Sequence, residues 1–97
     1  IKFIGGMIML DALMRDTKIK PKKLRREGYA TGTVRRKNGD VMPVILIGRV
    51  VDSYLAIHGD HSWMDIKLGD EEINTEIINV YRDVLMHNTI DIDLKEK

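Results

Sequence analysis

Basic residues dominate one quarter of the chain, and their chemistry is the binding of anions. Between Arg15 and Lys37 there are ten lysines and arginines against two acids, which gives this segment a net charge of +8. Lysine binds phosphate as a point charge and arginine as a planar fork of donors. Lys22, Arg25 and Arg26 are spaced so that a helix would present them on one side. Such like charges repel within a fold, which favours an external anion as their partner.

The rest of the chain offers these cations an internal partner as well. From Asp60 to Lys97, ten acids oppose four basic residues, so the overall charge of +1 conceals a strongly polarised chain. Nucleic acid outside the fold and carboxylates within it both remain possible partners. A membrane surface is a poorer one, because only Ile19 and Leu24 would supply the apolar face that a surface-bound helix needs.

Catalytic and metal-binding patterns are weak by comparison. His58, Asp60 and His61 form a compact group of metal-ligand types, but they fall in a predicted turn, so exposed turn residues are the favoured interpretation. Asp91 and Asp93 alternate with apolar residues, which places both on the outer face of a strand, where carboxylates contribute little to catalysis. The chain also has no serine elbow and no phosphate-binding glycine loop. The sequence therefore predicts no enzyme, no cofactor and no metal.

Length and composition limit the fold that holds these residues. Ninety-seven residues, 43% hydrophobic and 32% charged, suit one domain with its own core. The absence of cysteine excludes disulfides and suits the reducing cytoplasm. The longest apolar stretch, residues 41–47, is too short to span a bilayer. We expect a single domain over residues 7–97, with residues 1–6 as a cloning remnant or a flexible N-terminus.

Apolar periodicity predicts the elements. Apolar runs or alternating patterns indicate strands over residues 7–14, 29–36, 41–47, 62–68, 72–81 and 89–94. Asn38-Gly39 is typical of a hairpin turn between the second and third of these. A short helix is expected over residues 20–27, where Pro21 suits the first turn, and an amphipathic helix over residues 48–59. The fold class is therefore mainly β, a small antiparallel barrel of about six strands with two or three short helices.

In their order, these motifs resemble a known family. Residues 20–32 contain Leu24-Arg25-Arg26 followed by Gly28 and Tyr29, and residues 64–68, 80–83 and 90–94 follow with similar spacing. Over residues 8–94 the chain resembles the family of bacterial large-subunit ribosomal protein L twenty-five and the CTC general stress protein. The resemblance implies a small antiparallel barrel that binds 5S ribosomal RNA, reading a distorted duplex by its shape and 2′-hydroxyl groups.

The resemblance and the charge pattern together predict an RNA-binding site. Carried over position by position, the resemblance assigns RNA contacts to Arg15, Lys20, Arg25 and Asp93. The charge pattern adds Lys22, Lys23, Arg26, Arg35 and Arg82. The chain also departs from the family, which usually has a proline, a tyrosine, a glutamine and a histidine, respectively, at Thr31, Arg35, Tyr81 and Asp91.

The leading prediction is a non-enzymatic protein that binds 5S ribosomal RNA, is a monomer when free, and joins the large ribosomal subunit in the cytoplasm. Neither a membrane nor a small-molecule substrate is expected as a partner. The alternative is a divergent general-stress or protein-interaction module that keeps the fold and has a weakened RNA site. A third, metal-binding alternative rests on His58 and His61.

Overall fold

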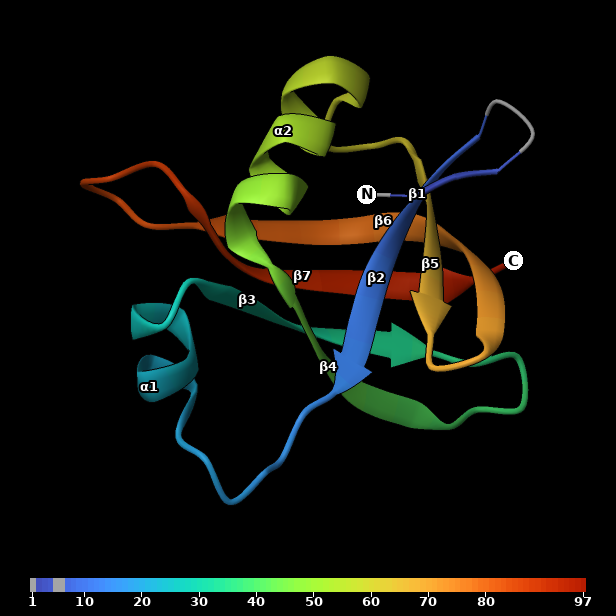
Figure 1. The fold of residues 1–97 in the computed structure, drawn as a ribbon, viewed down its shortest axis with the longest axis horizontal. Coiled ribbons are helices and arrows are strands. Elements are labelled where there is room, and N and C mark those ends of the chain that lie inside the picture. The colour runs from blue at the N-terminus through green and yellow to red at the C-terminus, as the bar shows by residue number, and fades with distance from the viewer. Residues whose placement is uncertain (1, 5–6) are drawn as a thin grey trace.

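A computed structural model describes residues 2–4 and 7–97. It is mainly β, with two helices, α1 (Pro21–Arg26) and α2 (Gly48–His58), as the sequence predicts (Figure 1). The strands are β1 (Lys2–Ile4), β2 (Met7–Met14), β3 (Tyr29–Arg35), β4 (Val41–Ile47), β5 (Trp63–Leu68), β6 (Glu71–Arg82) and β7 (Thr89–Glu96). Each predicted strand and helix is present, with its ends displaced by at most two residues.

Six of the strands close into a barrel. Their order is β2-β4-β3-β7-β6-β5, and β5 returns to pair with β2. Four of these pairings are antiparallel, but β2–β5 and β3–β7 are parallel. The barrel is thus mixed, and the prediction of an antiparallel one was wrong in this respect. Alternation shows which face of a strand is buried, whereas the direction of its neighbour depends on how the long connections return the chain.

The β3–β4 hairpin turns at the predicted Asn38-Gly39 pair. Arg35 and Val41 are the last paired residues before the turn. Within the turn, the Asp40 amide donates to the Asn38 side-chain oxygen at 3.0 Å, a local bond that favours a tight turn. The hairpin register places Arg35 and Thr33 on the outer face of the barrel, because Val34 is fully buried between them.

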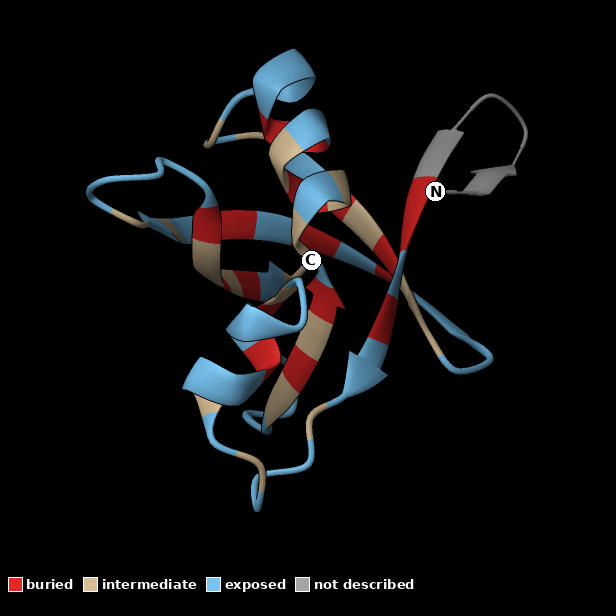
Figure 2. Cartoon of the chain, turned by 60° about the vertical axis from the view of Figure 1, so that its left-hand side comes forward, coloured by how far each residue is buried: buried red, intermediate tan, exposed pale blue. Residues whose placement is uncertain are grey.

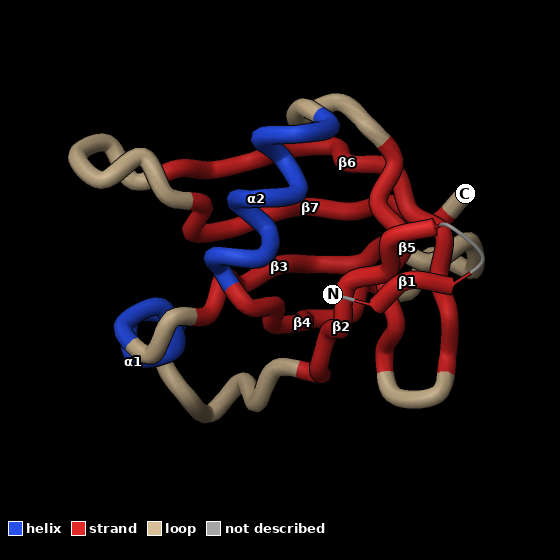
Figure 3. Tube along the Cα trace, turned by 45° about the horizontal axis from the view of Figure 1, so that its top comes forward, coloured by secondary structure: helices blue, strands red, loops and turns tan. Residues whose placement is uncertain are grey.

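Apolar side chains fill the barrel interior. Burial alternates along the strands, as the banding in Figure 2 shows. α2 lies against the barrel (Figure 3) and adds Val51, Tyr54 and Leu55 to the core, and the Tyr54 hydroxyl donates to the Trp63 carbonyl. Each buried Leu or Ile side chain contributes roughly 1.5–3 kcal/mol. The other core residues are Leu10, Ala12, Val34, Val44, Leu46, Met64, Ile66, Ile73, Ile77, Ile92 and Leu94. Because these side chains occupy the interior, a ligand must bind on the outer surface.

The N-terminal residues extend this sheet. Lys2–Ile4 form β1, which pairs antiparallel with Met7–Met9 at the start of β2. The prediction that residues 1–6 are foreign or flexible falls partly on positions 1, 5 and 6, which lie outside the described residues. Neither helix of the described chain has the length and apolar character required to cross a membrane.

Candidate nucleic-acid interface

The short helix α1 carries the densest positive charge of the molecule. Its six residues include Lys22, Lys23, Arg25 and Arg26, and only Leu24 is buried, with 5% of its surface exposed. Pro21 begins the helix, as expected for a residue with a fixed φ and no amide hydrogen. Three of the cations lie in the last turn, where the negative end of the helix dipole stabilises them. The helix therefore buries one leucine and presents its charged side chains at the surface.

Arg25 connects α1 to the barrel. Its Nε donates to the Ile90 carbonyl at 3.2 Å, and its Nη2 donates to the Thr31 hydroxyl at 3.1 Å. These bonds use two of the five N–H groups of the guanidinium. The sequence predicts Arg25 as an RNA contact, and the structure gives it an additional role in orienting α1 on β3 and β7.

A ladder of Thr–Asp hydrogen bonds continues from Arg25 across the outer face. The Thr31 hydroxyl contacts an Asp91 oxygen, and the Thr33 hydroxyl contacts an Asp93 oxygen, both at 2.9 Å. The parallel register of β3 and β7 brings these residues side by side. Thr31 and Asp91 are both departures from the family pattern, and they bond to each other. The predicted site residue Asp93 is half-buried, and its carboxylate is oriented by Thr33.

The remaining predicted cations of residues 15–26 differ in exposure. Among the described residues, the side chains of Lys20, Lys22, Lys23 and Arg26 are exposed and form no ion pair with a carboxylate. Arg15 is half-buried at the end of β2, where its backbone amide donates to the Pro43 carbonyl at 3.0 Å.

Arg35 lies at the end of the face distant from α1. It is exposed at the last position of β3 and lines a small hollow of about 120 Å³ with Asn79, Asp93 and Lys95. This hollow combines two cations with an amide and a carboxylate. The predicted site thus runs from α1 along β3 and β7 to this hollow.

Two other arginines are neutralised within the fold. Arg36 bonds Glu96 at 3.0 Å and also pairs with Glu71, and hydrogen bonding to its guanidinium lowers the pKa of Glu71. Arg82, a predicted RNA contact, donates two bonds of 2.6 Å to Asp60. The internal pairing left open by the sequence therefore occurs at these two arginines, whereas the cations of α1 remain available.

The pair of Arg82 and Asp60 predicts a pH dependence of stability. Hydrogen bonding from Arg82 holds the pKa of Asp60 below its ordinary value of 3.8. The pair therefore stabilises the fold fully above pH 3.8, and this contribution is lost as the pH falls through the lowered pKa. Asp60→Asn should lower the urea midpoint at pH 6, with a difference from wild type that shrinks below pH 3.8. A difference that stayed constant from pH 6 to pH 2 would contradict this assignment.

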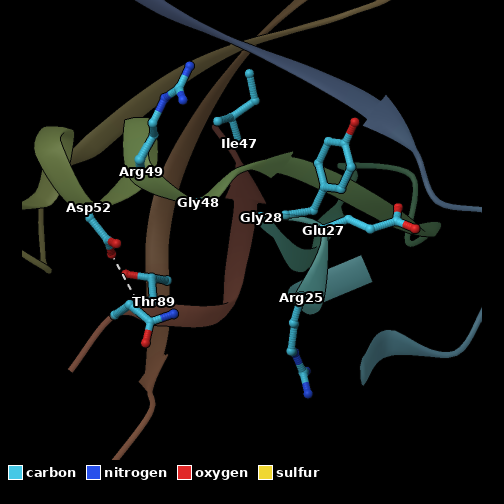
Figure 4. A pocket seen from close by; sticks show the side chains of 10 residues that line it. Arg25, Glu27, Gly28, Ile47, Gly48, Arg49, Asp52 and Thr89 are labelled. Atoms are coloured by element: carbon cyan, nitrogen blue, oxygen red, sulfur yellow. Dashed lines mark hydrogen bonds between the residues drawn. The ribbon is translucent and has the colours of Figure 1, made fainter. Parts of the chain in front are cut away.

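A cavity of about 380 Å³ separates α1 from the start of α2 and from β7. Arg25 and Arg49 lie on opposite sides of it, and the Thr89 amide donates to Asp52 at 2.8 Å on a third side (Figure 4). The sequence analysis did not identify this cavity, because its lining comes from three elements far apart in the chain. Tyr29, Gly48 and Asn88 also line it.

The loop between β6 and β7 presents apolar side chains to solvent. Val84, Leu85 and Met86 are 86%, 85% and 77% exposed. The Asp83 carboxylate accepts the amides of Leu85 and Met86 at 2.9 Å, and these bonds lower the pKa of Asp83. His87 follows at a φ of 61°, in the left-handed region. The sequence analysis did not identify this loop. Its signal in the sequence is three consecutive apolar residues that follow no alternating pattern.

His58 and His61, the alternative metal site, have no further metal ligand placed beside them in the described part of the chain. His58 packs its ring on Tyr54 with centroids 4.4 Å apart, and His61 is exposed. Residues 2–4 and 7–97 contain no group of three potential ligands placed to hold a metal ion.

Comparison with known proteins adds no family. No protein-family model matches the chain, and no curated protein matches it significantly.

Proposed function

We propose that this chain binds structured RNA through α1 and the adjoining outer face of β3 and β7, with 5S ribosomal RNA of the large subunit as the target. One observation carries the proposal: α1 places four cations on the surface with no carboxylate partner in the described chain. α1 buries only Leu24 and is otherwise held by the two hydrogen bonds of Arg25, so its exposed cations suit an external polyanion as their partner. Cytoplasmic, ribosome-associated localisation follows from this proposal.

The outer face supports the proposal by its mixture of groups. Helical cations bind phosphates, while the half-buried Asp93 carboxylate and Thr33 hydroxyl offer partners to sugar hydroxyls and base donors. The Thr33–Asp93 pair fixes the Asp93 carboxylate in orientation, which suits it to accept such a donor. Deformed RNA duplexes expose these groups in a wide minor groove.

Titration of the chain with 5S ribosomal RNA across salt concentration tests the proposal. Log K should fall linearly with log salt, by roughly one unit of slope for each phosphate contact. With four or more contacts, affinity falls by about two orders of magnitude or more between 50 and 200 mM salt. The absence of binding at 50 mM salt would refute the proposal.

Asp91 provides a charge test on the same face. Asp91→Asn keeps an oxygen that accepts from Thr31 and removes a negative charge next to the proposed RNA path. We expect RNA to bind several-fold more tightly to this variant at 100 mM salt, because the repulsion of phosphate is removed. Asp70→Asn, at the exposed turn between β5 and β6, is the control and should change affinity little. Equal effects of the two substitutions would place Asp91 outside the interface.

The second candidate is a protein-interaction or stress-response module, and the exposed apolar loop at Val84–Met86 favours it. Co-sedimentation separates the two functions. A ribosomal protein should pellet with the large subunit at low salt and dissociate as salt rises, whereas an interaction module should remain in the supernatant.

A further inference from the structure

The apolar loop, the cavity and α1 form one continuous surface. Asn88 ends the loop and Thr89 begins β7, and both line the cavity. Arg25 lines the same cavity from α1 and is bonded to the Ile90 carbonyl. The loop and α1 both lie at the same side of the barrel in Figures 1 and 3. RNA that extends from α1 along this side of the barrel would meet the cavity and then the loop.

The groups that line the cavity suit a single unstacked nucleotide. Tyr29 offers an aromatic ring, Asn88 an amide with donors and an acceptor, and Arg49 a guanidinium for a phosphate or a base. Glu27 and Asp52 add carboxylates, which can accept from base amino groups or sugar hydroxyls but repel a phosphate. Aromatic stacking combined with hydrogen bonds to base edges is the usual way in which proteins bind bases that have left the stack. A base that remains paired in a duplex cannot enter a recess of this kind.

The tip of the β6–β7 loop, residues 84–86, suits the apolar gap that an extruded base leaves in the stack. The side chains of Val84, Leu85 and Met86 have no hydrogen-bond donors for phosphates, so contact with the outside of a duplex gives them little. Between separated base steps they would be buried, and Leu and Met occur as wedges at such steps in protein–DNA complexes. The hydrogen bonds to Asp83 fix the loop before binding, which reduces the entropy lost on insertion.

We infer that the RNA ligand carries an extruded nucleotide, which enters the cavity between α1 and α2 while the Val84–Met86 tip occupies the vacated position in the stack. This inference rests on the proposed function, because α1 supplies the phosphate contacts that bring the RNA to the cavity. It names a class of RNA: a helix with a bulged or unpaired base next to a groove that α1 can approach.

Two RNA hairpins of the same stem sequence test the inference. One carries a single 2-aminopurine bulge, and the other is fully paired. The wild-type chain should bind the bulged hairpin at least ~10-fold more tightly and change its 2-aminopurine fluorescence, as expected when apolar burial and base contacts add to the phosphate contacts. Leu85→Ser and Arg49→Ala should each bring this preference close to unity and leave the affinity for paired RNA nearly unchanged.

The controls separate this inference from the proposed function. Ile57→Ser removes a side chain that is 75% exposed on α2 and should retain the bulge preference. Equal affinity of wild type for the two hairpins would overturn the inference and leave RNA binding intact, whereas no affinity for either would overturn both. Binding to phosphatidylserine vesicles that Leu85→Ser abolishes, without a bulge preference, would assign the tip to a lipid surface and also overturn the inference.

Discussion

Charge reversal at Lys23 and Arg26 should abolish high-affinity RNA binding. Both side chains are exposed on α1 and form no ion pair in the described structure, so the double variant Lys23→Glu/Arg26→Glu should keep the fold. It loses only the interaction of the two cations with the helix dipole, about 0.3–1 kcal/mol each. Each substitution removes a phosphate contact and adds repulsion, so we expect a loss of about 100-fold or more at 100 mM salt. The slope of log K against log salt should become shallower by about two. Filter binding with 5S ribosomal RNA measures both quantities.

The control variant Lys97→Glu distinguishes the effect of a cation's position on RNA affinity from the effect of net charge. Lys97 lies over the Trp63 ring at 3.7 Å, and the C-terminus lies on the side of the barrel away from α1 (Figure 1). Its reversal changes the net charge as much as Lys23→Glu does, yet it should weaken RNA binding only slightly. If Lys23→Glu and Lys97→Glu caused equal losses, binding would depend on overall charge, and α1 would not be the contact surface.

Gly32→Ala should destabilise the protein strongly, and more than Gly48→Ala does. Gly32 is buried in β3 beside Ile92, its partner in the parallel pairing with β7. A Cβ at this position would lie 2.6 Å from the Ile92 carbonyl oxygen, a backbone atom that cannot rotate away. The two strands must separate or shift, at a cost of about 2–4 kcal/mol. Chemical denaturation followed by circular dichroism measures the change.

Gly48→Ala is the matched comparison. A Cβ there would lie 3.1 Å from the Gly28 carbonyl, so a small displacement accommodates it, and alanine favours the helix that Gly48 begins. It should therefore cost clearly less than Gly32→Ala. Because Gly32 lies one residue from Thr31 and Thr33, its substitution should also disturb the Thr–Asp ladder. A Gly32→Ala variant as stable as wild type would show that β3 and β7 are not packed as described.

Part of the candidate site followed from local sequence. Pro21, the surrounding lysines and arginines and Gly28 predict a short basic helix, and the structure places α1 within one residue of that prediction at each end. The same local pattern places Asp91 and Asp93 on the outer face of β7. Local signals suffice here because helix ends and strand faces depend on residues only a few positions apart.

Which cations pair with a carboxylate within the fold could not be predicted from the sequence. Arg36 pairs with acids 35 and 60 positions away, and Arg82 pairs with an acid 22 positions away. The bond between Thr31 and Asp91 joins residues 60 positions apart. These contacts depend on which distant segments the closed barrel brings side by side, and composition and alternation do not specify that.

The sequence by itself determined the elements of this protein, the turn at Asn38-Gly39, the separation of a basic segment from an acidic half, and the presence of a mainly β barrel. These features arise from side-chain type and short-range spacing. Only the tertiary structure decided that two strand pairs are parallel, that the cations of α1 stay unpaired while Arg36 and Arg82 are neutralised, and that a cavity and an apolar loop adjoin α1. The physical reason is that closing the barrel brings together residues tens of positions apart, and their pairing depends on how the whole chain packs.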